Sequence, residues 1–237
     1  MNLGDHVNDA PRHVTANRAA LQQAIGSRPV FLKQVHGVSV EQLGSTTPHG
    51  TVADACVTSQ HRLACTIMVA DCLPVLLTNT SGTAVAAAHA GWRGLAGTGG
   101  KGVLEAVLSA FQVPNKPLDQ SIRAQAAPEI IAWLGPCIGP KAFEVGAEVK
   151  AAFEASQPDA TQFFTAGPNG QFLADLAGLA RARLQALGIK QIYGNDSSTD
   201  WCTVGNPSRF FSHRRDAGVG GNGFNTTGRM AACIWLT

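Results

Sequence analysis

Residues 64–90 read ACTIMVADCLPVLLTNTSGTAVAAAHA, and this stretch decides the fold. The apolar run at 64–70 is shorter than most helices and stops at Asp71. A short and nearly continuous apolar run of this kind is typical of a strand that is buried on both faces. We therefore predict a central buried strand that ends just before Asp71 and Cys72.

The second half of the same stretch predicts a β-hairpin. Two apolar runs, 75–77 and 84–88, lie on either side of the turn-forming residues 79–82. A hairpin returns the chain to the level at which it started, so the residues before the first run meet those after the second. Cys72 and His89 are therefore expected to be neighbours in space.

Outward from the hairpin, the pattern predicts alternating strands and helices without internal repeats. Helices are predicted at residues 14–25, 103–111, 139–155 and 172–187, and strands at 30–35, 38–43, 189–193, 210–212 and 230–236. Residues 114–128 are predicted to be an exposed connection and residues 218–223 a hairpin loop. The predicted fold class is α+β, with mixed β-sheets covered by helices in one layered domain spanning residues 1–237.

Composition restricts the class of protein. The chain has 237 residues, of which 45% are hydrophobic and 14% charged, and its formal net charge is +2. Charged or polar residues interrupt every apolar run, so no membrane span is predicted. The small net charge gives no indication of nucleic acid as a partner. The first residues lack the features of a secretory signal, which predicts a cytoplasmic protein with reduced thiols. The sequence leaves the oligomeric state open.

Three side chains that are distant in the sequence form a candidate metal site: His36, Cys72 and His89. Each stands where an apolar run stops, and strand ends deliver such side chains to a common cleft. Two imidazoles and a thiolate supply three of the four ligands of a tetrahedral zinc and leave one position open, as in catalytic zinc sites. Their spacing matches no local metal motif, and each residue taken alone is more often structural.

The same residues fit other classes of protein. Cys72, activated by His89 or His36, would be the nucleophile of a metal-free cysteine hydrolase. A copper oxidase is disfavoured, because the 7 histidines are scattered and include no His-x-His pair. A binding module without enzymatic activity is the last alternative.

Further candidates surround the three residues in the sequence. Arg93 and Arg214 are predicted phosphate contacts, since guanidinium groups match phosphate oxygens, although a surface salt bridge is the simpler role for Arg93. Gln34 is a candidate substrate contact. Asp71 is either a strand-end cap or a residue that orients a ligand. The glycine-rich residues 94–102 either start a helix that accepts an anion or simply reverse the chain.

Six motifs, in this order, resemble those of the YfiH family over essentially the whole chain. They are KQVHG (33–37), ADCLPV (70–75), HAGWRG (89–94), WLGPCIGP (133–140), FFSHRRD (210–216) and TGRMA (227–231). That family was once labelled multicopper polyphenol oxidases or laccase-domain proteins. It is now described as zinc-dependent purine nucleoside phosphorylases with adenosine deaminase activity.

The resemblance implies a function and a ligand set. The family's zinc ligands fall on His36, Cys72 and His89, and copper belongs to the older description. The implied partners are small molecules: phosphate with adenosine, inosine and, as a further candidate, S-methyl-5′-thioadenosine. Relatives described as editing enzymes of peptidoglycan precursors would instead fit an amidase that uses Cys72 with His89. Relatives also carry an arginine-containing segment ahead of Met1-Asn2-Leu3-Gly4, so a short N-terminal family segment is expected to be missing here.

Overall fold

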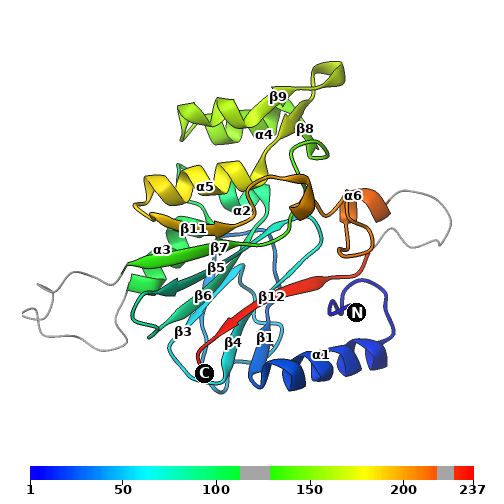
Figure 1. The fold of residues 1–237 in the computed structure, drawn as a ribbon, viewed down its shortest axis with the longest axis vertical. Helices are drawn as coiled ribbons and strands as arrows, with labels where there is room; N and C mark the ends of the chain where they lie inside the picture. The colour runs from blue at the N-terminus through cyan, green and yellow to red at the C-terminus, as the bar shows by residue number, and fades with distance from the viewer. Residues whose placement is uncertain (113–128, 218–226) are drawn as a thin grey trace, which may run out of the picture.

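The computed structural model describes residues 1–112, 129–217 and 227–237, which form the predicted α+β fold of stacked sheets and helices (Figure 1). The larger sheet is mixed and has six strands in the order β11-β7-β5-β6-β3-β2. These strands are β2 (Val40–Gln42), β3 (Ala55–Thr58), β5 (Leu73–Asn79), β6 (Val85–Ala90), β7 (Ile130–Leu134) and β11 (Gln191–Gly194). Antiparallel pairs occupy the centre, and the two outermost pairs are parallel.

A second mixed sheet faces the first. It contains β1 (Arg28–Phe31), β4 (Leu63–Val69) and β12 (Met230–Trp235), with β4 in the middle. Helix α1 (Pro11–Ile25) lies against its outer side, where Leu21 packs on a cluster that includes Phe31 and Met68. The helix begins at a proline and ends before Gly26, whose φ of 63° is the left-handed conformation common after a helix.

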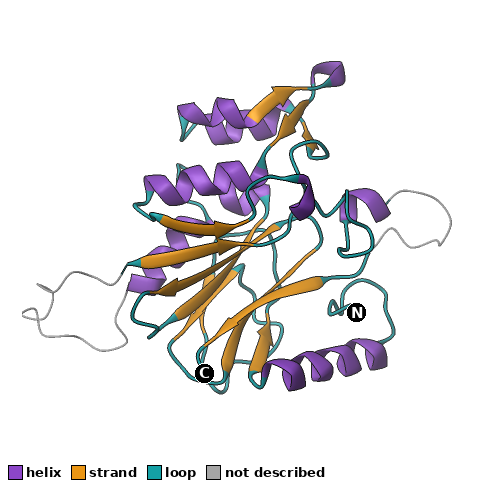
Figure 2. Cartoon of the chain, in the orientation of Figure 1, coloured by secondary structure: helices purple, strands orange, loops and turns teal. Residues whose placement is uncertain are grey.

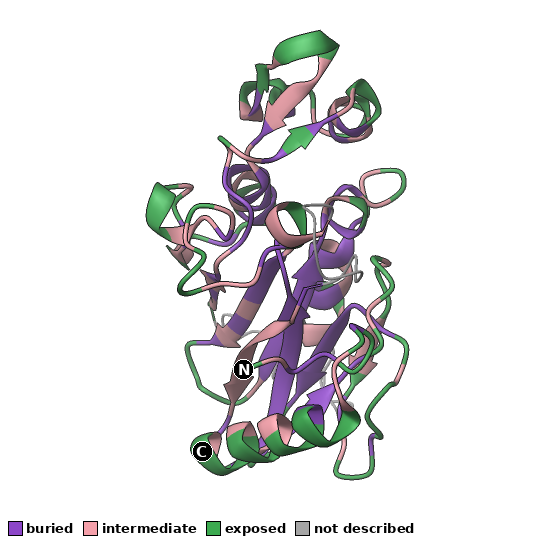
Figure 3. Ribbon diagram, turned by 90° about the vertical axis from the view of Figure 1, so that its right-hand side faces the viewer, coloured by how far each residue is buried: buried purple, intermediate pink, exposed green. Residues whose placement is uncertain are grey.

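Two apolar layers hold the sheets and helices together. Every residue of β4 and of β6 is buried, and side chains such as Ile67 and Val85 fill the space between the sheets (Figure 3). The opposite face of the six-stranded sheet packs against the main core cluster. That cluster is covered by α2 (Trp92–Ala96), α3 (Val103–Gln112), α4 (Ala147–Glu154) and α5 (Leu176–Ala186).

Shorter elements complete the chain. Figure 2 shows a small sheet next to α4, which consists of β8 (Glu144–Val145), β9 (Phe164–Ala166) and β10 (Phe172–Ala174). Helix α6 (His213–Asp216) begins at Ser212, whose hydroxyl accepts the backbone N–H of Arg215. The 3₁₀ turns are η2 (Pro158–Phe163), η3 (Pro168–Gly170) and η4 (Thr199–Trp201).

The hairpin predicted around residues 79–82 is confirmed. Strands β5 and β6 pair antiparallel, with Leu73 opposite Ala90 and Pro74 opposite His89. Cys72 directly precedes β5, so this register places it beside the end of β6 that carries His89. The predicted strand at 64–70 is also confirmed as β4.

Two predicted helices are wrong at their N-terminal ends. Residues 139–155 contain a turn and strand β8 before α4 begins, and residues 172–187 contain β10 before α5 begins. The two unpredicted strands pair with each other, Phe172 with Val145 and Leu173 with Glu144. This long-range pairing overrides the local helical pattern.

The remaining differences between prediction and structure concern three predicted strands. The predicted strands 30–35 and 38–43 shorten to β1 and β2, because the backbone between them turns toward Asp54. Residues 210–212 form no strand and lead instead into α6.

The predictions for 114–128 and 218–223 fall on residues outside those described. Within the described parts of the chain, no helix combines the length and apolar character that a membrane crossing requires.

Candidate active site

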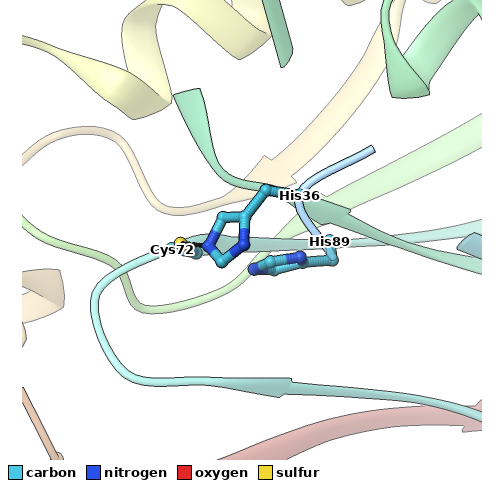
Figure 4. A group of neighbouring side chains, drawn as sticks. All are labelled: His36, Cys72 and His89. Atoms are coloured by element: carbon cyan, nitrogen blue, oxygen red, sulfur yellow. Dashed lines mark hydrogen bonds between the residues drawn. The ribbon is translucent and has the colours of Figure 1, made fainter. Parts of the chain in front are cut away.

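The structure brings His36, Cys72 and His89 together, and their side chains point toward one another (Figure 4). The potential ligand atoms of the three residues all lie within 4.8 Å of one another. The Cys72 Sγ is 3.7 Å from the His36 Nε2, and the two imidazole rings meet edge to face at a centroid distance of 4.8 Å. His36 lies in the loop after β1, Cys72 in the link from β4 to β5, and His89 on β6.

The backbone around the three side chains is unusual. His36 has a φ of 61° and Asp71 a φ of 85°, conformations that few residues other than glycine adopt. Gly91 passes so close that an added Cβ would lie 2.8 Å from the His36 Cδ2 and 3.1 Å from the Cys72 Sγ. The chain therefore holds a tightly turned backbone at this point, which is frequent at functional sites.

Asp54 is a site residue that the sequence analysis missed. Its fully buried carboxylate lies 2.8 Å from the His89 Nδ1. The same carboxylate accepts the backbone N–H groups of Val35, His36 and Gly37. The available signal was an ionisable residue between two alanines at the start of a buried strand, since such a residue needs partners.

The three side chains influence each other's protonation. Burial alone would raise the pKa of the Cys72 thiol, but the charge of His89 and hydrogen bonds from His36 and His89 outweigh burial and lower that pKa to about 6. Burial would lower the pKa of His89, yet the Cys72 thiolate and the Asp54 carboxylate raise it to about 9. Burial likewise opposes ionisation of Asp54, and hydrogen bonds from His89, Gly37 and Val35 nevertheless keep its pKa below the ordinary value. The group thus favours a thiolate, the form that binds metal.

The donor set fits a transition metal such as zinc. The sulfur of one thiolate and the nitrogens of two imidazoles lie close enough together to bind one ion. The buried His89 also has a carboxylate, that of Asp54, next to its Nδ1. Metal-binding histidines usually have such a partner. His36 is exposed and Cys72 is half-buried, so the group opens to solvent on one side.

The opening leads into a cavity of about 670 Å³. One wall is apolar and includes Phe31, Met68 and Val69, whereas Arg18, Arg214 and Arg229 add positive charge. A cavity with an apolar wall and a few polar groups is typical of a small-molecule site.

Two predicted residues have other partners. Gln34 lines the cavity, but its side-chain amide donates to the Met68 carbonyl and accepts the Met68 N–H, which fixes the loop to β4. The hydrogen-bond partners of the Asp71 carboxylate lie outside the group of three. It accepts the hydroxyl of Thr203 and, at 2.6 Å, the backbone N–H of Arg214, and so ties α6 to the link that carries Cys72.

The predicted phosphate contacts separate in space. Arg214 lines the cavity, and its guanidinium also donates to the carbonyls of Ala142 and Glu144. Arg93 is exposed, packs over the ring of Trp92, and is not among the residues that line this cavity. Its role as a phosphate contact stays a prediction.

The glycine-rich residues 94–102 hold a carboxylate from within the chain. The Gly102 N–H donates to the side chain of Glu105. The carboxylate of Glu105 therefore takes the place of the external anion that was predicted as one possibility for this helix start. The buried Arg183 pairs with Glu105 and donates to the carbonyls of Ala96 and Gly100. Through these contacts Arg183 links α5 to α2, to α3 and to the segment between them.

Arg18 and Arg229 line the cavity, although the sequence analysis assigned them no role. The guanidinium of Arg18 stacks over Phe31 and pairs with Asp5. Burial lowers the pKa of Arg229, and the negative charges of Cys72 and Asp71 oppose this change. Arg229 therefore brings a partly desolvated positive charge close to the thiolate.

Comparisons with known proteins agree with this architecture. The family model described as multi-copper polyphenol oxidoreductase laccase matches residues 1–237. Proteins named purine nucleoside phosphorylase from Pseudomonas aeruginosa and Escherichia coli are each 44% identical to the chain, covering 100% of it and 86% of their own length. A solved structure from Neisseria meningitidis superposes with a TM-score of 0.83 at 42% identity, covering 99% of this chain and 86% of that one. The Bacillus licheniformis protein YfiH gives a TM-score of 0.79 at 27% identity, covering 100% of this chain and 85% of that one.

Proposed function

The chain belongs to the multi-copper polyphenol oxidoreductase laccase family, and on this premise we propose that it is a purine nucleoside phosphorylase. The observation that carries the proposal is the cavity in which the His36, Cys72 and His89 group meets both an apolar wall and arginines. The proposed substrates are adenosine, inosine and S-methyl-5′-thioadenosine, each with inorganic phosphate.

The two kinds of wall suit the two substrates. A purine ring is flat and apolar on its faces, so it fits against the apolar side of the cavity, which includes Met68 and Val69. Phosphate is an anion whose oxygens match guanidinium groups, so it fits near Arg214 and Arg229. The volume of about 670 Å³ falls within the range of cavities that hold ligands of this size.

Phosphorolysis needs binding and charge stabilisation more than a strong base. An oxygen of phosphate forms a bond to C1′ of the ribose while the bond from C1′ to the purine nitrogen breaks. The purine leaves with the electron pair and takes up a proton, and ribose 1-phosphate remains. Arg214 and Arg229 would hold the phosphate in line with C1′ and offset its charge.

We further propose that His36, Cys72 and His89 hold zinc and that the site also deaminates adenosine. When bound, zinc would act as a Lewis acid and lower the pKa of a water molecule toward neutrality. This chemistry suits hydrolytic removal of the amino group at C6 of adenine. The ionised state favoured for Cys72 and the carboxylate partner of His89 support the metal assignment.

One observation favours a second candidate function. Asp54, His89 and Cys72 follow one another as carboxylate, imidazole and thiol, the order found in cysteine hydrolases. In that case Cys72 is the nucleophile, no metal is required, and an amide of a peptidoglycan precursor is the candidate substrate.

Phosphate dependence tests the proposed phosphorylase. Purified protein is incubated with inosine in the presence and absence of phosphate, and hypoxanthine and ribose 1-phosphate are quantified. We expect equal amounts of both products with phosphate and neither without it. Release of hypoxanthine at the same rate in phosphate-free buffer would show hydrolysis and contradict the proposal.

Variants locate the phosphate contacts. Arg214→Ala and Arg229→Ala are expected to raise the KM for phosphate at least tenfold, since each removes a positive charge from the cavity. Lys190→Ala, which removes an exposed charge outside the cavity, is the control. Arg93→Ala completes the series. The sequence predicts that this variant raises the KM for phosphate, whereas the position of Arg93 outside the cavity lining predicts an unchanged KM.

A further inference from the structure

The carboxylate of Asp54 joins two parts of the site that are distant in the sequence. Its Oδ1 lies 2.8 Å from the His89 Nδ1 and accepts the His36 N–H at 2.8 Å. Its Oδ2 accepts the Gly37 N–H at 2.7 Å, and the Val35 N–H lies 3.1 Å from both oxygens. We propose that Asp54 is the positioning residue of this site, which fixes both the donor atom of His89 and the loop that presents His36. The inference rests on the proposed metal centre for its consequence, but not for its geometry.

Asp54 fixes the orientation and the tautomer of the His89 ring. An ionised carboxylate only accepts hydrogen bonds, so the Nδ1 of His89 must carry a hydrogen where it faces Asp54. The lone pair of the neutral ring then lies on the Nε2, which is the atom left to bind a metal. The backbone reinforces this orientation, because the His89 N–H donates to the Asp54 carbonyl at 2.7 Å.

Asp54 also anchors the loop that carries His36. Three successive N–H groups, from Val35 to Gly37, converge on one carboxylate instead of pairing along a strand. This convergence stabilises the left-handed backbone of His36, whose φ is 61°. The loop would lose its anchor without Asp54, because no other acceptor of these three N–H groups is found among the described residues.

The site requires a carboxylate and not merely an acceptor of the same shape. In Asp54→Asn, one orientation of the amide places its NH₂ group against the N–H of Gly37, where two donors oppose each other. The other orientation places the NH₂ group against the His36 N–H and the Nδ1 of His89. His89 can then respond only by moving its hydrogen to Nε2, which removes the lone pair that would bind a metal.

Zinc affinity is the first test. Competition with a chromophoric chelator measures the zinc affinity of the wild type and of Asp54→Asn, and a loss of ten- to a hundredfold is expected. Asp175→Asn is the matched control, because Asp175 also accepts a backbone N–H and a hydroxyl, those of Gly178 and Ser197, but lies at the start of α5. Unchanged zinc affinity in a folded Asp54→Asn variant would overturn the inference.

The wild-type protein provides a second test that does not depend on the folding of a variant. Nuclear magnetic resonance of ¹⁵N-histidine-labelled protein reports which ring nitrogen of His89 carries a hydrogen. We expect a protonated Nδ1 both with and without zinc, and an unprotonated Nδ1 would overturn the inference. Neither test uses a nucleoside, so a wild type that cleaves none would contradict the proposed function and leave the assignment of Asp54 intact.

Discussion

Gly91 determines how closely the backbone can pass the side chains of the site. It precedes α2 with a φ of −67°, a conformation open to any residue, so its role lies in the space that it leaves free. That space is occupied by the ring of His36 and the sulfur of Cys72. A glycine at this position is therefore a requirement of the site and not of the backbone.

Gly91→Ala is expected to weaken zinc binding while the fold remains intact. The new Cβ would lie 2.8 Å from the His36 Cδ2 and 3.1 Å from the Cys72 Sγ, so the ring and the sulfur must shift from their present positions. We expect at least a tenfold loss of zinc affinity, measured by chelator competition. Gly205→Ala is the control, because the nearest atom to its new Cβ is 3.8 Å away, and it should leave zinc affinity unchanged. Equal affinity in both variants would mean that His36 contributes little to binding.

At the scale of elements, a partly buried ion pair links helices α3 and α5. Arg183 on α5 is almost fully buried, pairs with Glu105 on α3, and donates to the carbonyls of Ala96 at the end of α2 and of Gly100 in the connection to α3. Arg183→Met should destabilise the protein by about 2 kcal/mol, because the buried carbonyl of Ala96 and the half-buried acceptors of Gly100 and Glu105 lose their donor. Denaturant unfolding measures this loss. Zinc affinity should stay unchanged. A free energy of unfolding equal to that of the wild type would contradict the stabilising role of Arg183.

Helix α6 is held by a carboxylate whose effect depends on pH. Asp216 accepts hydrogen bonds from Arg215 and Thr227, which connects α6 to the segment before β12. Burial alone would raise the pKa of Asp216, but the bonds from Arg215, Thr227 and the Ser212 N–H outweigh it and lower the pKa.

A lowered pKa in the folded state means that the ionised carboxylate stabilises the fold. This stabilisation is fully present above the unfolded value of 3.8 and is lost as the pH falls through the lower folded value. The wild type should therefore melt at a higher temperature than Asp216→Asn at about pH 7, and the difference should shrink toward about pH 3. A difference that stays constant over this range would contradict the assignment.

The elements also show what the sequence can and cannot predict. The β5–β6 hairpin and its consequence for Cys72 and His89 were predictable, because the apolar runs and the turn are local. Strands β8 and β10 were not, since each is short, lies next to a true helix, and exists through pairing in the small sheet, where β10 lies between β8 and β9. Asp54 was missed for a similar reason: its partners, the loop at His36 and the ring of His89, become neighbours only in the fold.

At the scale of the whole molecule, the site exists only where the two sheets meet. His36 follows a strand of the three-stranded sheet, His89 lies on the six-stranded sheet, and Cys72 lies in the link by which the chain passes from one sheet to the other. The three potential ligands are thus assembled by the packing of the sheets. A metal bound to all three would stabilise the folded state, because the unfolded chain lacks the site.

The most direct test of the account is the rate of inosine cleavage after chelation, measured before and after zinc is restored. If the three side chains hold a catalytic zinc, chelation abolishes cleavage, one equivalent of zinc restores it, and bound zinc slows alkylation of Cys72 by iodoacetamide, because the ion engages the lone pair of the thiolate. Cys72→Ser should then retain little zinc and little activity. Full activity after chelation, abolished rapidly by iodoacetamide, would contradict the account and identify Cys72 as the nucleophile of a metal-free hydrolase.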